Sequence, residues 1–184
     1  GDNFKQKDHE IFNKLENISG KIIDGRKNAF PGEVISDFLQ ENKNFFPKLE
    51  EFANQIFDKV KQNNRTRYIA LCQFLKDEYG ITVKDVIPKE GKPFSKIYKV
   101  KDKELLLSDY LSLETKKLFA AAQISQEGAS KEIDEYLTTF NFPTEESKKL
   151  TRVALLNYCG AAILMPYSLF HKECKELKYD LELL

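Results

Sequence analysis

An almost uninterrupted apolar run near the C-terminal end, Val153 to Met165, constrains the fold of this chain more than any other stretch. Asn157 is its only clearly polar residue, and a helix that is apolar on all sides is buried on all sides. The run is too short for a membrane span, which needs about 20 apolar residues, and Pro166 ends it. We therefore predict a central buried helix, and its small residues let neighbouring elements approach closely: Ala154, Gly160, Ala161 and Ala162.

The periodicity of apolar residues predicts further helices around this one. They are expected over residues 3–23, 31–40, 47–60, 66–79, 112–127, 133–140 and 167–177, and the central helix is expected to start at Thr144 as its N-cap. Alternating β-branched residues predict a strand over residues 81–88. A hairpin is predicted from two further strands, residues 94–100 and 104–107. The predicted class is α+β, mostly helical, with a small three-stranded sheet packed on helices.

The first predicted helix, residues 3–23, carries a heptad-like apolar stripe. Ile11, Leu15, Ile18 and Ile22 are spaced 4, 3 and 4 residues apart, as in a coiled-coil seam. Such a stripe can pack on the body of its own domain. Alternatively, it can pair with the same stripe of a second chain, in a helix that follows a preceding domain. The residues leave both interpretations open.

Charge and cysteine usage exclude several classes of function. Lys and Arg total 29 and Asp and Glu total 29, whereas DNA-binding modules usually have a basic excess. Three cysteines without a CxxC pair favour a reducing compartment. With no signal peptide and no transmembrane stretch, we expect a cytoplasmic protein without a membrane partner. The chain begins without Met, so we expect it to be a fragment of a longer protein.

The C-terminal region carries a family resemblance. The string NYCGAAILMPYSLF, followed by LKYDLELL, resembles a region of the bacterial short-chain fatty acid (fatty acyl-CoA) regulators. Cys159 departs from the usual Phe of that region, and Lys178 departs from the usual Arg. The residues that match the pattern are Asn157, Tyr158, Ala161, Leu164, Met165, Pro166, Tyr167, Tyr179, Asp180 and Leu183.

The resemblance implies a domain organisation. The stretch FPGEVISDFLQENKNFFPKLEEFA is similar to the segment that follows the DNA-binding region in these regulators, which extends the match to roughly residues 30–184. Family members have an N-terminal XRE-type helix-turn-helix, a central domain related to ImmA/IrrE-type zinc metallopeptidases, and a C-terminal domain. The expected domains are therefore 1–28, a helix or linker from a missing DNA-binding domain, and 29–184, a degenerate domain on a zincin-like ImmA/IrrE-type scaffold.

The chemistry of an active zinc peptidase is missing from the matching positions. Such an enzyme needs H-E-x-x-H on a helix, where two His bind zinc and the Glu is the general base. The stretch 118–128, LFAAAQISQEG, resembles the family segment that carries this motif. Gln123 stands at the first His, Ile124 at the general base and Glu127 at the second His, and the third ligand falls near Val153. We expect no catalytic residue, no bound metal and no cofactor.

The resemblance leaves the former cleft as a candidate ligand pocket. Its polar candidates are Gln123, Glu127, Arg152, Asn157 and Tyr158. The guanidinium of Arg152 suits the carboxylate of a fatty acid or the phosphates of acyl-CoA. Three of the five also have a purely structural interpretation. Arg152 can pair with a surface carboxylate, Asn157 can tie a loop backbone, and Tyr158 can be a core aromatic residue with a satisfied hydroxyl.

Three hypotheses of function remain. The first is a non-catalytic domain that senses a short-chain fatty acid or acyl-CoA, or transmits that signal, in a homodimeric transcriptional regulator. DNA would then be bound only through a domain missing from this chain. The second is a structural dimerisation or spacer domain, which the stripe at residues 11–22 would fit. The third is a divergent metallopeptidase that uses other ligands.

Overall fold

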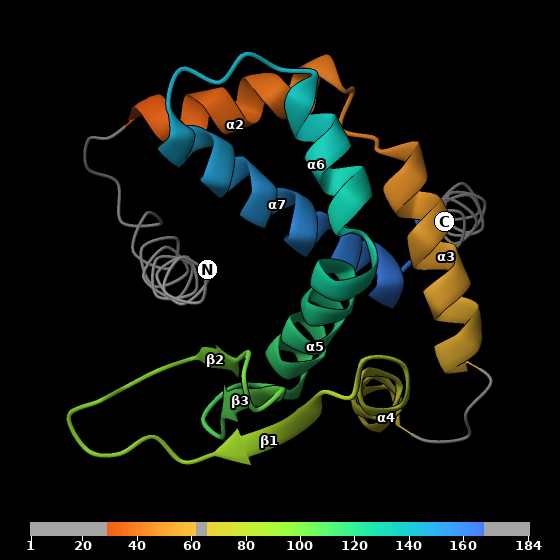
Figure 1. The fold of residues 1–184 in the computed structure, drawn as a ribbon, viewed down its shortest axis with the longest axis vertical. Helices are drawn as coiled ribbons and strands as arrows, with labels where there is room; N and C mark the ends of the chain where they lie inside the picture. Colours follow the sequence, from red (N-terminus) through yellow and green to blue (C-terminus); the bar gives the residue numbers. More distant parts are fainter. Residues whose placement is uncertain (1–28, 62–65, 168–184) are drawn as a thin grey trace, which may run out of the picture.

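The computed structural model describes residues 29–61 and 66–167, which form six helices and one three-stranded sheet (Figure 1). The predicted helices over 3–23 and 167–177 lie outside the described residues, apart from Tyr167. The α+β, mostly helical class is confirmed. The elements are α2 (Ala29–Glu41), α3 (Pro47–Lys61), α4 (Arg67–Tyr79), β1 (Thr82–Val86), β2 (Lys96–Lys99), β3 (Glu104–Ser108), α5 (Leu113–Gly128), α6 (Ser130–Thr138) and α7 (Glu145–Leu164).

Helix α7 is the central element, as predicted. It crosses the middle of the molecule and packs against α2, α3, α5 and α6 (Figure 1). Its start is held by a capping box, in which the Thr144 hydroxyl accepts from the Ser147 backbone N–H at 3.0 Å and the Ser147 hydroxyl accepts from the Thr144 N–H at 3.4 Å. Both bonds satisfy backbone donors that a helix start leaves open.

Two apolar clusters are joined by α7 and α3. The first fills the space between α3, α4, the sheet, α5 and the end of α7, and its fully buried members include Leu71, Leu75, Leu105 and Ile124. The second lies under α2 and α6, and it includes Phe38, Phe46, Ile133 and Leu155. Because α7 contributes buried residues to both clusters, it connects the two parts of the hydrophobic core.

One face of α7 differs from the prediction. Ala161 is exposed, and Leu150, Ala154, Asn157 and Leu164 are only half-buried. Leu164 packs against the first apolar cluster, so we call the other four residues, Leu150, Ala154, Asn157 and Ala161, the outer seam of α7. The prediction that this helix is buried on all sides is wrong for this face, because the four helices packed against α7 occupy its other faces. None of the described helices is long and apolar enough to cross a membrane.

The sheet has the order β1-β3-β2. Strands β2 and β3 pair antiparallel, which confirms the predicted hairpin, while β1 pairs with β3 in parallel. The prediction did not include this parallel pair. Gly80 ends α4 in the left-handed conformation, with φ of 71°, and its N–H bonds back to the helix before the chain enters β1. The hairpin carries Tyr98 of β2 to the side of α5 where the candidate site lies.

Candidate functional site

The candidate site is built on α5, at the positions where the resemblance places the lost zinc motif. Ser112 caps this helix by accepting a hydrogen bond from the Thr115 N–H at 3.2 Å. Gln123 and Glu127 are one turn apart, so they share a face of the helix. The Gln123 Nε2 donates to Glu127 Oε1 at 2.8 Å, and Gln123 is only 4% exposed. The two residues therefore form a partly buried carboxamide–carboxylate pair.

A tyrosine from the sheet completes this pair. The Tyr98 hydroxyl on β2 is hydrogen-bonded to Glu127, and burial, with the Glu127 charge as a smaller cause, raises the pKa of Tyr98 to about 12. Burial also raises the pKa of Tyr79 at the end of α4, with added contributions from the charges of Glu78 and Glu127. The carboxylate of Glu127 thus lies near two phenols that stay neutral over the physiological pH range.

The residues at these positions do not fit a zinc ion. Zinc prefers thiolate, imidazole and carboxylate ligands, whereas Gln123 offers an amide that donates to Glu127. Ile124, which the resemblance aligns with the general base, is fully buried in the core, and Val153, near which the resemblance places the third ligand, has an aliphatic side chain. Within residues 29–61 and 66–167, no three His, Cys, Asp or Glu side chains gather where they could hold a metal ion.

Arg152 is engaged by three partners from two other helices. Its Nη1 donates to Gln126 Oε1 at 2.8 Å, its Nη2 donates to the Ser130 hydroxyl at 3.1 Å, and its Nε pairs with Asp134 Oδ1 at 3.1 Å. These partners come from the end of α5 and from α6. The guanidinium therefore ties α5, α6 and α7 together, and binding of an anionic ligand would have to displace some of these bonds.

The two remaining candidates, Tyr158 and Asn157, are on α7. The Tyr158 hydroxyl donates to Glu50 on α3, and its ring meets Phe46 edge to face with 5.1 Å between centroids. Burial, followed by the Glu50 hydrogen bond, raises the pKa of Tyr158. Asn157 lies on the half-buried outer seam of α7. The structure thus brings Gln123 and Glu127 together and gives Arg152 and Tyr158 other partners.

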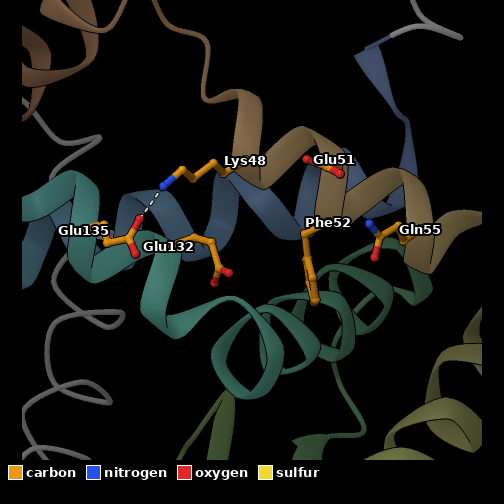
Figure 2. A pocket seen from close by; sticks show the side chains of 6 residues that line it. All are labelled: Lys48, Glu51, Phe52, Gln55, Glu132 and Glu135. Carbon is orange, nitrogen blue, oxygen red and sulfur yellow. Dashed lines mark hydrogen bonds and ion pairs between the residues drawn. The ribbon is translucent and has the colours of Figure 1, made fainter.

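The sequence interpretation missed two features. Tyr98 was not singled out as a site residue. The only signal in the sequence was its position in a strand of the predicted hairpin. A groove of about 390 Å³ between α3 and α6 was also missed, and its lining is strongly charged (Figure 2). Lys48 and Glu135 form an ion pair across it. The groove is built from two amphipathic helix faces far apart in the sequence, and it is lined by Lys48, Glu51, Phe52, Gln55, Glu132 and Glu135.

Tyr98→Phe should weaken the pH dependence of stability in alkali. The pKa of Tyr98 is about 12 in the folded chain, above the value of about 10 in an unfolded chain. The folded state therefore holds this proton longer, so the stabilisation is complete below pH of about 10 and is lost as the pH rises toward about 12. In urea titrations over this range, the free energy of unfolding should fall less steeply in Tyr98→Phe.

The control for this experiment is Tyr110→Phe, since the side chain of Tyr110 is 77% exposed. It should reproduce the alkaline slope of the unmodified chain. Equal slopes for Tyr98→Phe and the unmodified chain would contradict the raised pKa of Tyr98.

Comparisons with known proteins agree with this scaffold. The model of the IrrE N-terminal-like domain family (Peptidase_M78) matches residues 76–184. The chain is 28% identical over 156 residues to the HTH-type transcriptional regulator PrpR of Mycobacterium tuberculosis (strain ATCC 25618 / H37Rv), covering 84% of this chain and 32% of that protein. It is 25% identical over 154 residues to the HTH-type transcriptional regulator RamB of M. tuberculosis (strain CDC 1551 / Oshkosh), with the same coverage of 84% and 32%.

A solved structure shows the same arrangement. A Mycobacterium tuberculosis transcriptional regulator superposes with a TM-score of 0.72 at 27% sequence identity, covering 84% of this chain and 46% of that chain. The chain spans about a third of the length of the two curated relatives, at 32% of each.

Proposed function

The chain belongs to the family of IrrE N-terminal-like domains, and from this premise we propose that it is a non-catalytic regulatory domain of a transcriptional regulator. In this proposal the domain senses a short-chain fatty acid or acyl-CoA, or transmits that signal. The whole protein binds DNA through a helix-turn-helix domain elsewhere, because two relatives are named HTH-type regulators and this chain has no basic excess.

The observation that carries the proposal is the Gln123–Glu127 pair. It stands on α5 where a peptidase of this family type would hold its metal, and the two side chains satisfy each other at 2.8 Å. The helices of the scaffold are kept, whereas the side chains at the metal positions no longer fit zinc. This combination supports ligand binding or signal transmission rather than peptide hydrolysis.

The chemistry of the pair favours one ligand class over the other. Glu127 repels a carboxylate or a phosphate placed beside it. A free fatty acid offers only its carboxylate as a polar group, whereas acyl-CoA can place the amide groups of its pantetheine arm here, away from its phosphates, and these amides can donate hydrogen bonds to Glu127. We therefore place acyl-CoA before the free acid. Ligand binding would act by population shift, because a ligand stabilises the conformation that it binds best. The regulator itself is proposed to be a homodimer.

A thermal-shift screen tests the proposal against acetyl-, propionyl- and longer acyl-CoA, the free acids, and zinc. A ligand present at about 100 times its dissociation constant stabilises the native state by about 2.7 kcal/mol. We expect a shift with the acyl-CoA series that is reduced in Glu127→Gln. The matched control is Glu114→Gln in the first turn of the same helix, where the side chain is 78% exposed and the shift should be kept.

The other outcomes select the other hypotheses. A flat response to every ligand would leave a structural dimerisation or spacer domain, the use that the apolar stripe at residues 11–22 would also fit. A shift with zinc alone would favour the divergent metallopeptidase and would contradict the poor fit of Gln123 and Ile124 to a metal.

A further inference from the structure

The outer seam of α7 has the pattern of a helix-pairing surface. Its residues Leu150, Ala154, Asn157 and Ala161 are spaced 4, 3 and 4 apart, which is the 3.5-residue repeat of a coiled-coil seam. Since Ala161 is exposed, none of the described elements lies across the seam there. Three of the four residues are apolar, so the face is suited to contact with another apolar stripe.

We propose that residues 3–23 of this same chain dock onto the outer seam of α7 as an antiparallel helix. This inference goes beyond the proposed function, because it concerns how the segment that leads toward any upstream domain is held. It also chooses between the two uses of the N-terminal stripe that the sequence left open.

The two stripes match in period and in size. The N-terminal stripe repeats at 4, 3 and 4 residues with large side chains at Ile11, Leu15, Ile18 and Ile22. The seam has small side chains at Ala154 and Ala161. Large side chains on one helix insert into the holes that small residues leave on the other.

The place where the N-terminal segment joins α2 is also compatible with docking on the outer seam. Residue 28 joins α2, which packs against α7, and the first turn of α2 lies toward the start of α7 (Figure 1). The five residues 24–28 span at most roughly 17 Å, and neighbouring helix axes are about 8–10 Å apart. A helix over residues 3–23 would be roughly 31 Å long, enough to cover a seam of roughly 17 Å between Leu150 and Ala161. This geometry places Ile18 opposite Ala154.

Disulfide trapping in the full 184-residue chain tests the contact directly. Cys72 and Cys174 are first replaced by Ser, while Cys159 is kept because it is buried. The pair Ile18→Cys and Ala154→Cys should then form an intrachain disulfide on mild oxidation, seen as a faster-migrating monomer on a non-reducing gel. The control pair, Ile18→Cys with Lys131→Cys on α6, should stay reduced. A missing bond, or a bond between two chains, would overturn the proposal.

Thiol labelling provides an independent readout. In the same Ser background, Ala161→Cys should react with a maleimide at least about tenfold faster when Leu15→Asp and Ile18→Asp are added, because a docked helix protects the thiol until it opens. Glu114→Cys on α5 serves as the exposed control, and its rate should not change. Equal rates at Ala161→Cys with and without the two Asp substitutions would overturn the proposal. Protection that depends on protein concentration would also overturn it, since it would place a second copy on the seam.

Discussion

Phe46→Ala is expected to lower the free energy of unfolding by about 3–5 kcal/mol, the cost of removing a fully buried aromatic ring. Phe46 precedes α3 and is 0% exposed. Its ring stacks on Phe38 at 5.8 Å and meets Tyr136 and Tyr158 edge to face, each at 5.1 Å between centroids. Because these partners come from α2, α6 and α7, the cavity would loosen four elements together. Urea denaturation followed by circular dichroism measures the change.

The preceding residue offers a matched control. Phe45 is 39% exposed, and its ring contact is with Tyr167 at 5.5 Å. Phe45→Ala should therefore cost clearly less, on the order of 1 kcal/mol. If the two variants lost similar amounts of stability, the assignment of Phe46 to the second apolar cluster would be wrong.

Gly160→Ala is expected to lower the free energy of unfolding by about 1–3 kcal/mol, although alanine is the better helix former. Gly160 lies at a close contact between α7 and α5. A Cβ atom there would lie 2.9 Å from the backbone nitrogen and 3.1 Å from the Cα of Ala122. Backbone atoms of a packed helix cannot turn aside as a side chain can, so the two helices would have to separate.

Gly32→Ala makes the same chemical change on α2 in open space, with no atom within 4 Å of the added Cβ. It should raise the free energy of unfolding by up to about 1 kcal/mol through helix propensity alone. The difference between the two variants isolates the cost of the contact between α5 and α7. A stabilising Gly160→Ala would show that the two helices can move apart without loss.

The local elements were largely predictable from the residues. The N-cap at Thr144 was predicted correctly, because capping depends on residue types close in sequence. The same holds for the hairpin of β2 and β3. The five-residue site was harder to predict. Gln123 and Glu127 came together because helix geometry alone places residues four apart side by side.

Contacts between distant segments followed from the packing of the whole chain. The parallel pair of β1 and β3, the bond of Tyr98 to Glu127, and the three partners of Arg152 join residues that are separated along the chain. The apolar pattern of α7 correctly indicated a central helix, but it did not show which face the other helices would leave open. The apolar pattern of a helix shows which of its faces favour burial. Whether those faces are in fact buried depends on how many neighbouring elements the rest of the chain packs around the helix.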